Sequence, residues 1–561
     1  MALSGIILML PAVSFNQNVP IPKDKQISMH REVQDDPYKP NPFGNKKTSP
    51  AKKYNSTGIF TTQVNVNLNG ENILGDAANE PSLGVDPTNP DRMVIGWRQF
   101  DNVFSNFRQA GYAYTIDAGE TWTFMGTIET GIFRSDPVLD FDSDGFAYYN
   151  SLTSNSGIYT CKVFKSEDGG ALWNTGVEAH GGDKQWMTID RSGGPGAGNI
   201  YSFWTSYYSS CYPGFFTRSI DAGNSFEWCE EVTGNPYWGT MTVGNDGELY
   251  IAGSGNTGGI VVVKSTTALD PGVPVTWDFA TQVEMDGYIT SGISVNPIGL
   301  LGQASIDVDR SNGPGRGNVY VLASMVRIFN SDSADVMFSK STDGGLTWSY
   351  PVRINDDPGT DHYQWFGTMS TAPDGRIDAV WLDTRDAPTG SVLSALYYSY
   401  SIDQGETWSI NERLSELFDP HVGWPQQNKM GDYFDMESDN TGAHLAWANT
   451  LNGEQDVYYS YINPGVTGIQ SGGEKQDLIS LSNYPNPFSS KTTISYTLPV
   501  ASDVRMVIYD ISGKALKTLV DEKKQAGTHH LDWTSDLPAG FFECRLSAGT
   551  QTKHIGLVKT R

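Results

Sequence analysis

The chain has 561 residues, a formal net charge of −26 and only 18% charged residues, and it is rich in Gly (60), Tyr (27) and Trp (15). The strong negative charge argues against a nucleic acid or an anionic membrane as partner, because a phosphate surface requires a basic footprint. The length exceeds what one small core needs, and the Gly and aromatic content is typical of many short strands joined by tight turns.

The first residues contain an apolar run from Leu3 to Val13 that is not preceded by basic residues. The run is similar to the hydrophobic part of a signal peptide, so we interpret residues 1–15 as a signal-peptide-like segment. Residues 16–58 are rich in Pro, Lys and Asn and are predicted to form an irregular leader. No other run is apolar over the length that spans a membrane, so no transmembrane segment is expected.

A short motif of the form S/T-x-D-x-G-x-T-W recurs along the chain. Its five clear copies are residues 115–122, 166–173, 219–226, 341–348 and 401–408. In each copy the Asp can accept hydrogen bonds from the turn, the Gly supplies a positive φ, and the final aromatic packs beneath the hairpin. Each copy lies between two alternating segments, which indicates a β-hairpin turn, and repetition at intervals of tens of residues predicts a repeat fold.

A second repeat, a strand–turn–strand unit, precedes these turns. Its seven copies begin near Pro81, Asp136, Gln185, Trp238, Gln303, Trp365 and Asp432. Seven such units predict seven four-stranded blades over residues 59–465. The last unit lacks an outer strand, and residues 60–68 alternate like a strand, so we expect this segment to close the last blade and leave the ring without a free edge.

The motif resembles the Asp box of the sialidase superfamily, and the resemblance extends over residues 60–462. It implies a β-propeller with Asp-box (BNR) hairpins, in a family that includes sialidases, other glycoside hydrolases, polysaccharide lyases and non-catalytic binders. Sialidases have six blades and an arginine triad on the substrate carboxylate. Here Arg98, Arg134 and Arg385 are the residues that could form such a cationic cluster.

The C-terminal part differs in composition and begins after a Gly-rich linker at residues 466–478. Residues 479–561 carry YPNPF at 484–488, five alternating segments with turn residues between them, and LPAGFF at 537–542, which predicts a small Ig-like β-sandwich. The order of these motifs resembles the type A C-terminal sorting domain of the type IX secretion system. The resemblance implies that the secretion machinery is a partner and that the protein passes through the periplasm to be secreted or held at the outer-membrane surface.

Candidate site residues follow from the expected strand directions. In a propeller the starts of the innermost strands and the ends of the second strands share one face, and the Asp-box turns lie on the other, so the Asp-box carboxylates are structural. On the first face we predict three carboxylates as candidate catalytic groups, namely Asp136, Asp383 and Asp432. The candidate substrate-binding residues there are Arg98, Arg134, Arg385, Lys184, Trp186, Trp238 and Trp365.

Three functions fit this face. The first is a carbohydrate-active enzyme, most simply a glycoside hydrolase. The second is a non-catalytic binder of glycan or protein, and the third is a scaffold whose channel is filled by Trp and Phe. No cofactor or metal is expected, because residues 140–145 (DFDSDG) match the start of a calcium loop but Ser151 stands where such a loop has Glu. Cys211 and Cys229 either pair as a disulfide or stay free.

Overall fold

The computed structural model describes residues 35–40, residues 46–464 except 57, 156–157, 257 and 329–331, and residues 480–560 except 485, 487, 499–500, 511–513 and 550. Its contacts divide the chain into two compact units, Met1–Ile469 and Gln470–Arg561. The signal-peptide-like segment at 1–15, much of the leader at 16–58 and the whole linker at 466–478 lie outside the described residues. Among the described residues, no helix is long and apolar enough to cross a membrane.

The N-terminal unit is built from small antiparallel sheets in chain order. The first two are β5–β8 (Ala77–Val85, Met93–Phe100, Arg108–Thr115, Thr123–Ile128) and β9–β12 (Ser135–Phe141, Ala147–Asn155, Ile158–Ser166, Val177–Glu178). The next two are β13–β15 (Trp186–Ile189, Ile200–Phe203, Phe216–Ser219), with the short 3-10 helix η2 (Ser206–Tyr208) before β15, and β16–β19 (Met241–Val243, Leu249–Ser254, Ile260–Ser265, Phe279–Val283).

Three further sheets complete this unit within the described residues. They are β23–β26 (Ser305–Val308, Val319–Arg327, Asp335–Ser341, Val352–Arg353) with β20 (Gly287–Tyr288) on β24; β27–β30 (Gln364–Thr371, Ile377–Asp383, Ala395–Ser401, Glu412–Arg413); and β31–β33 (Asp435–Ser438, Ala443–Asn449, Asp456–Ile462) with β3 (Ile59–Gln63) and β2 (Lys53–Ser56). Two strand pairs lie outside these sheets. One is β1 with β4 (Thr48–Pro50, Glu71–Ile73), and the other is the hairpin of β21 with β22 (Ser291–Ile293, Asn296–Leu300).

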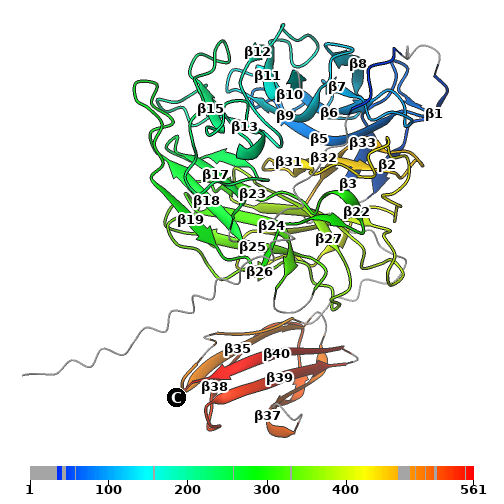
Figure 1. Ribbon diagram of the computed structural model, residues 1–561. Coiled ribbons are helices and arrows are strands. Elements are labelled where there is room, and N and C mark those ends of the chain that lie inside the picture. The colour runs from blue at the N-terminus through cyan, green and yellow to red at the C-terminus, as the bar shows by residue number, and fades with distance from the viewer. Residues whose placement is uncertain are drawn as a thin grey trace, which may run out of the picture. The chain divides into compact units, whose positions relative to one another are not determined.

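The first strands of successive sheets pack side by side in a closed ring. Strand β5 contacts β9, and the contacts continue through β13, β16, β23 and β27 to β31, which contacts β5 again. Figure 1 shows the sheets following one another around this ring, from the blue strands through green to the yellow ones. The all-β, propeller-like arrangement therefore has a closed inner wall made of one strand from each sheet.

The ring is closed by a strand from the N-terminal end of the unit. The segment expected over residues 60–68 is observed as β3, in which Ile59 pairs with Ile462 and Gln63 with Tyr458 of β33. The leader is not irregular throughout, which corrects the prediction for residues 16–58. Strand β2 pairs with β3 from Lys53 to Ser56. Its side chains alternate between exposed and half-buried, which is typical of the outermost strand of a sheet.

The five repeated turns share the hydrogen bonds that the Asp carboxylate accepts from the first Ser or Thr and from the backbone four positions later. In the turn at residues 341–348, Ser341 Oγ donates to Asp343 Oδ1 (2.7 Å), and Thr347 donates its N–H and Oγ to the same carboxylate (2.9 and 2.6 Å). The aromatic Trp348 Nε1 donates to the carbonyl of Gly345 (3.1 Å). The carboxylates of Asp117, Asp168, Asp221 and Asp403 accept from their turns in the same way. Each carboxylate is therefore used inside its own hairpin.

The C-terminal unit contains two antiparallel sheets. One has the order β34 (Ser480–Tyr484), β35 (Lys491–Leu498), β38 (Gly527–Thr534), and the other has β37 (Ala515–Lys524), β36 (Ser502–Tyr509), β39 (Gly540–Ala548), β40 (Gln551–Lys559). Both sheets contribute to one core, with Ile494 from the first and Met506, Leu546 and Leu557 from the second fully buried. Two strands were not expected from the sequence, β34 and β37, and β37 exposes most of its charged side chains as an edge strand does.

Candidate functional site

A cavity of about 540 Å³ lies inside the ring of first strands. It is lined by at least one residue from the first strand of every sheet: Leu83, Asp140, Met187, Met241, Ile306, Met369 and Asp435. The volume is within the range of cavities that hold small organic ligands, about 300–1,000 Å³. The ring of short strands therefore encloses a space large enough for a small ligand.

The two ends of the cavity differ in exposure. At the strand starts, Trp186, Phe366 and Tyr433 form an aromatic floor whose exposed fractions are 8%, 0% and 3%. The rings of Trp186 and Tyr433 meet edge to face, with centroids 5.5 Å apart. At the other end, the turns after the first strands carry Arg191 and Arg310, whose side chains are 33% and 42% exposed. The cavity thus has its mouth at the turns that follow the first strands.

Two carboxyl groups with raised pKa values line the wall. Asp435 Oδ2 accepts hydrogen bonds from Ser82 Oγ (2.6 Å) and Leu83 N (3.0 Å), and burial raises the pKa of Asp435 to about 7, with Glu437 and Asp140 adding to the rise. Burial also raises the pKa of Asp140 to about 6, although the nearby Arg191 opposes this. Both groups therefore change protonation near neutral pH, where they can act either as hydrogen-bond donors or as acceptors.

Two arginines fix the charge pattern of the mouth. Arg191, which follows β13, connects the second and seventh sheets, with Nη2 3.5 Å from Asp140 Oδ1 and Nη1 3.2 Å from Glu437 Oε1. Arg310 pairs with Asp307 (2.8 Å) and donates to the backbone carbonyl of Val243 (2.7 Å). Since both guanidinium groups are held by protein acceptors on at least two sides, they define a rigid polar rim rather than free cationic arms.

Within the described part of the chain, four buried polar atoms of residues in the cavity wall have no protein partner. Both the Oε1 and Nε2 atoms of Gln303 are unpaired, as are Thr371 Oγ1 and Ser438 Oγ, and all three residues line the cavity. Buried polar groups in native proteins almost always have a hydrogen-bond partner, from the protein, from water or from a ligand. The residues of the wall therefore have unused hydrogen-bonding capacity beside an aromatic floor.

Most sequence-predicted site residues lie in other surroundings. Lys184 Nζ is 3.3 Å from Asp136 Oδ2 and 2.8 Å from Asp432 Oδ2, and Lys429 Nζ is also 2.8 Å from Asp432 Oδ2. Lys429 and Arg98 share Glu80, at 3.4 and 3.0 Å. We call this group the inner ion-pair cluster; its members are Glu80, Arg98, Asp136, Lys184, Lys429 and Asp432, and all are at most 1% exposed.

The hairpin of β21 and β22 packs against this cluster. Leu300 N donates to Asp432 Oδ1 (2.9 Å), Met430 N donates to Asn296 Oδ1 (3.0 Å), and Asn296 Nδ2 donates to the carbonyl of Gly431 (2.9 Å). The hairpin contacts Asp432 and the residues just before it, so this strand start is covered rather than open to a ligand. The carboxylates of Asp136 and Asp432 are fully buried and bound to lysines, so a substrate does not reach them in this structure.

Asp383 and Arg385 form a separate polar group in the sixth sheet. Asp383 Oδ2 accepts from Arg385 Nε (2.9 Å) and Trp381 Nε1 (2.8 Å), and burial raises the pKa of Asp383 even though Arg385 opposes the rise. The guanidinium of Arg385 also stacks over the Tyr397 ring at 4.4 Å. Asp383 thus has its own set of partners, different from those of Asp136 and Asp432.

The three arginines expected to share an anionic group each have their own carboxylate: Arg98 pairs with Glu80, Arg134 with Glu129, and Arg385 with Asp383. Among the predicted tryptophans, Trp365 is fully buried and donates to Ser394 Oγ (3.1 Å), and Trp238 is half-buried beside Tyr237. Of the ten predicted site residues, Trp186 is the one that lines the cavity described above.

Four residues of the cavity were not among the predicted site residues, namely Asp140, Asp435, Arg191 and Gln303. Asp140 interrupts an apolar strand segment (Val138–Phe141), and a charged residue in an innermost strand is a usable signal for a wall position. Asp142, in the calcium-like segment, uses Oδ1 to accept from the backbone of Asp144 and Phe146 and Oδ2 to accept from Tyr148. That carboxylate therefore stabilises a turn.

The C-terminal unit matches a known family. The model described as "Secretion system C-terminal sorting domain" matches residues 482–559. No curated protein matches the chain.

Among solved structures, the chain is similar to a protein of unknown function from Dyadobacter fermentans (14% identity, 72% of this chain and 99% of that chain, TM-score 0.40). It is also similar to a Penicillium chrysogenum α-L-arabinanase complexed with arabinobiose (10%, 74% and 98%, TM-score 0.36) and to Trypanosoma rangeli sialidase (10%, 91% and 89%, TM-score 0.38). The chain thus joins a propeller-like ring of sheets to a secretion-system C-terminal sorting domain, and the protein is secreted or held at the outer-membrane surface.

Proposed function

We propose that the N-terminal unit is a seven-bladed β-propeller that binds a small glycan in its central cavity, and that the C-terminal unit is an Ig-like β-sandwich recognised by the type IX secretion machinery. The closed contacts of the first strands, from β5 to β31 and back to β5, support one blade for each sheet. The resemblance of the five turns to Asp boxes supports a place among carbohydrate-binding or carbohydrate-active propellers.

One observation carries the choice of ligand. The cavity wall combines the unpartnered amide of Gln303 and the hydroxyls of Thr371 and Ser438 with the aromatic rings of the floor. A sugar has hydroxyl groups that both donate and accept hydrogen bonds and apolar C–H faces that pack on aromatic rings. Such a ligand satisfies the orphan groups and contacts the floor at the same time.

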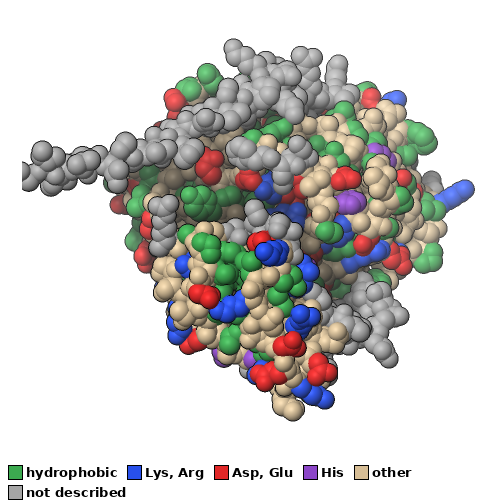
Figure 2. All heavy atoms as spheres, turned by 90° about the horizontal axis from the view of Figure 1, so that it is seen from below, with side chains coloured by type: hydrophobic (Ala, Val, Ile, Leu, Met, Phe, Trp, Pro, Cys, Tyr) green, Lys and Arg blue, Asp and Glu red, His purple; other side chains and the backbone are tan. Residues whose placement is uncertain are grey.

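The charge distribution supports an uncharged or weakly charged ligand. Acidic and basic side chains are interspersed on the face of the molecule that Figure 2 draws. The charge that a ligand meets is set by the residues at the mouth of the cavity. At the mouth of the cavity, Arg191 and Arg310 are already paired with Asp140 and Asp307. Neither arginine offers the free guanidinium fork that a strongly anionic ligand requires.

The test is calorimetric titration of the full chain with a panel of neutral and acidic mono- and disaccharides, alongside the variant Gln303→Leu. We expect the variant to bind at least about tenfold more weakly, since it loses two hydrogen bonds worth about 1 kcal/mol each. Its stability should be unchanged or higher, because it removes two unpaired buried polar atoms. The control is Gln282→Leu, an exposed residue on the outer strand β19.

Failure of every sugar to bind the wild type, or equal binding by Gln303→Leu, would refute the cavity as a glycan site. Hydrolysis is the second candidate function, and it is favoured by one observation, the carboxyl pair Asp140 and Asp435 with pKa values raised to about 6 and 7. A raised carboxyl pKa is what a general acid of a glycosidase needs near neutral pH. Release of new reducing ends during the same titrations would indicate catalysis, and intact sugars would indicate binding alone.

A further inference from the structure

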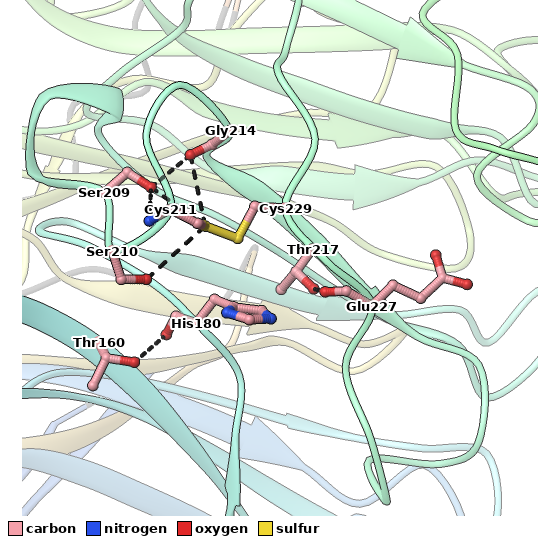
Figure 3. The surroundings of a disulfide bond; sticks show 9 residues. All are labelled: Thr160, His180, Ser209, Ser210, Cys211, Gly214, Thr217, Glu227 and Cys229. Atoms are coloured by element: carbon pink, nitrogen blue, oxygen red, sulfur yellow. Dashed lines mark hydrogen bonds between the residues drawn. A yellow bond between two sulfur atoms is a disulfide. The ribbon is translucent and has the colours of Figure 1, made fainter.

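A disulfide joins two loops at the outer side of the third sheet (Figure 3). The sequence left the pairing of Cys211 and Cys229 open, and the structure joins them, with Cα atoms 6.2 Å apart. One loop follows η2 and the other precedes the bridge between Phe216 and Glu230. The ring of His180 lies beside the disulfide, with a nitrogen within 4.8 Å of both sulfur atoms. The two loops are therefore fixed to each other and to the edge of the neighbouring sheet.

Three large aromatic side chains project from these loops into solvent. Tyr207, Tyr212 and Trp228 are 68%, 75% and 72% exposed, and we call them the aromatic platform. Tyr212 directly follows Cys211 and Trp228 directly precedes Cys229, so the disulfide holds their backbones close together. The ring of His180 meets Trp228 edge to face at 5.1 Å, and Tyr207 meets Tyr208 in the same way at 4.9 Å.

Exposure of three such rings has a free-energy cost that a purely structural loop would avoid. Each ring offers a large apolar surface that burial would stabilise. The loops keep these rings outside while their small residues pack inward, for example Ser209 Oγ, which donates to the carbonyl of Gly214 (2.5 Å), and Cys211 itself. Large exposed aromatic groups on a rigid support are typical of binding surfaces.

The charges around the platform restrict the partner. Residues 205–215 and 226–233 contain Glu227, Glu230 and Glu231 and no Lys or Arg. Glu227 is paired with Arg218 (2.7 Å), whereas Glu230 and Glu231 are exposed. An anionic polymer or an anionic lipid surface is therefore repelled, while an uncharged partner is not.

We propose that the aromatic platform is a second glycan-binding surface, which binds a neutral polysaccharide by stacking its pyranose rings on Tyr212, Trp228 and Tyr207. The apolar faces of sugar rings match the exposed aromatic faces, and the surrounding carboxylates and Ser hydroxyls can accept and donate hydrogen bonds to sugar hydroxyls. The disulfide lowers the entropic cost of binding because the loops are already ordered. The surface lies outside the central cavity and does not depend on it.

The experiment uses affinity electrophoresis and calorimetry of the full chain with soluble β-1,4-glucan, β-1,4-mannan and starch, and with polygalacturonate as the anionic comparison. We expect the wild type to bind at least one neutral polymer and not polygalacturonate. The variants Trp228→Ala and Tyr212→Ala should each weaken this binding about tenfold, as removal of a central aromatic contact does. Both residues are exposed, so far-UV circular dichroism and the thermal midpoint should stay unchanged.

The matched control is Tyr350→Ala, which removes a tyrosine that is 93% exposed after the turn of the fifth sheet. It should bind the polymer as the wild type does. The cavity variant Gln303→Leu should also keep polymer binding, which separates this surface from the proposed cavity site. If the wild type binds no neutral polymer, as a surface for a protein partner would predict, or if Tyr350→Ala weakens binding as much as Trp228→Ala, the proposal is overturned.

Discussion

Replacement of Lys184 by Met tests whether the inner ion-pair cluster is structural. The Lys184 ammonium lies 2.8 Å from Asp432, 3.3 Å from Asp136 and 3.5 Å from Asp183, and its side chain has no exposed surface. Burial alone would lower the pKa of Lys184, but the facing aspartates raise it well above its ordinary value, so the cation is firmly held. Removal of one partner of a buried ion pair costs about 3–5 kcal/mol, and we expect a loss in this range.

The assay is equilibrium urea denaturation of the full chain at pH 7, followed by tryptophan fluorescence. The control is Lys52→Met, because Lys52 lies 3.5 Å from Glu416 with side chains 30% and 75% exposed, and such a surface ion pair contributes at most about 1 kcal/mol. The double variant Lys184→Met/Asp136→Asn should recover part of the lost stability, since it removes one of the carboxylates left without a counter-charge.

Two results would refute the reasoning. One is a loss below about 1 kcal/mol for Lys184→Met, which is the size expected of a surface pair. The other is an unchanged stability combined with weaker sugar binding. In that case Lys184 would contact substrate, as the sequence analysis predicted, and the covering of the strand start at Asp432 by the β21–β22 hairpin would not describe the protein in solution.

Two further predictions concern the cavity wall and the repeated turns. Burial raises the pKa of Asp435 from its ordinary 3.8 to about 7, so the wild type loses stability as the pH rises through this interval. The variant Asp435→Asn keeps an acceptor for Ser82 and cannot ionise. Its stability advantage over the wild type, measured by urea denaturation, should therefore be larger at pH 8 than at pH 4.5. An equal margin at the two pH values would contradict the raised pKa. Asp343→Ala removes the hydrogen bonds from Thr347 and should lower the urea midpoint by the equivalent of about 1 kcal/mol without changing sugar affinity, whereas an unchanged midpoint would show that the turn does not need its carboxylate.

The repeated hairpins were predictable because their chemistry is local. In each turn the first Ser or Thr donates to the Asp, and the Asp accepts from the backbone N–H four positions later, so the motif alone predicts these hydrogen bonds. The bond from the Trp indole to the Gly carbonyl is formed by Trp122 and Trp348. The closing strand β3 was predictable from its alternation and from the missing outer strand of the last sheet. Both features depend on short-range patterns that a single sequence displays.

The position of the central cavity was not predictable, for two physical reasons. First, Asn296 and Leu300 of the β21–β22 hairpin contact residues about 130 positions later in the chain, and the periodicity of the sequence does not predict contacts over such a distance. Second, the backbone enters five of the innermost strands through residues with positive φ that are not glycine, namely Glu80, Asp136, Lys184, Trp238 and Phe366. Side chains other than Gly rarely adopt this conformation, so simple strand alternation misplaces these residues.

Pairing of β3 with β33 places the two ends of the ring side by side, Gln63 opposite Tyr458. The edge of β3 that faces β33 has no partner until β33 is in place, so the circle is completed only when both ends of the unit have folded. Truncation anywhere between the two strands therefore leaves an open arc with two unpaired edges, which is prone to aggregate. The ring can therefore close only in a chain that contains both β3 and β33, so closure depends on an intact chain.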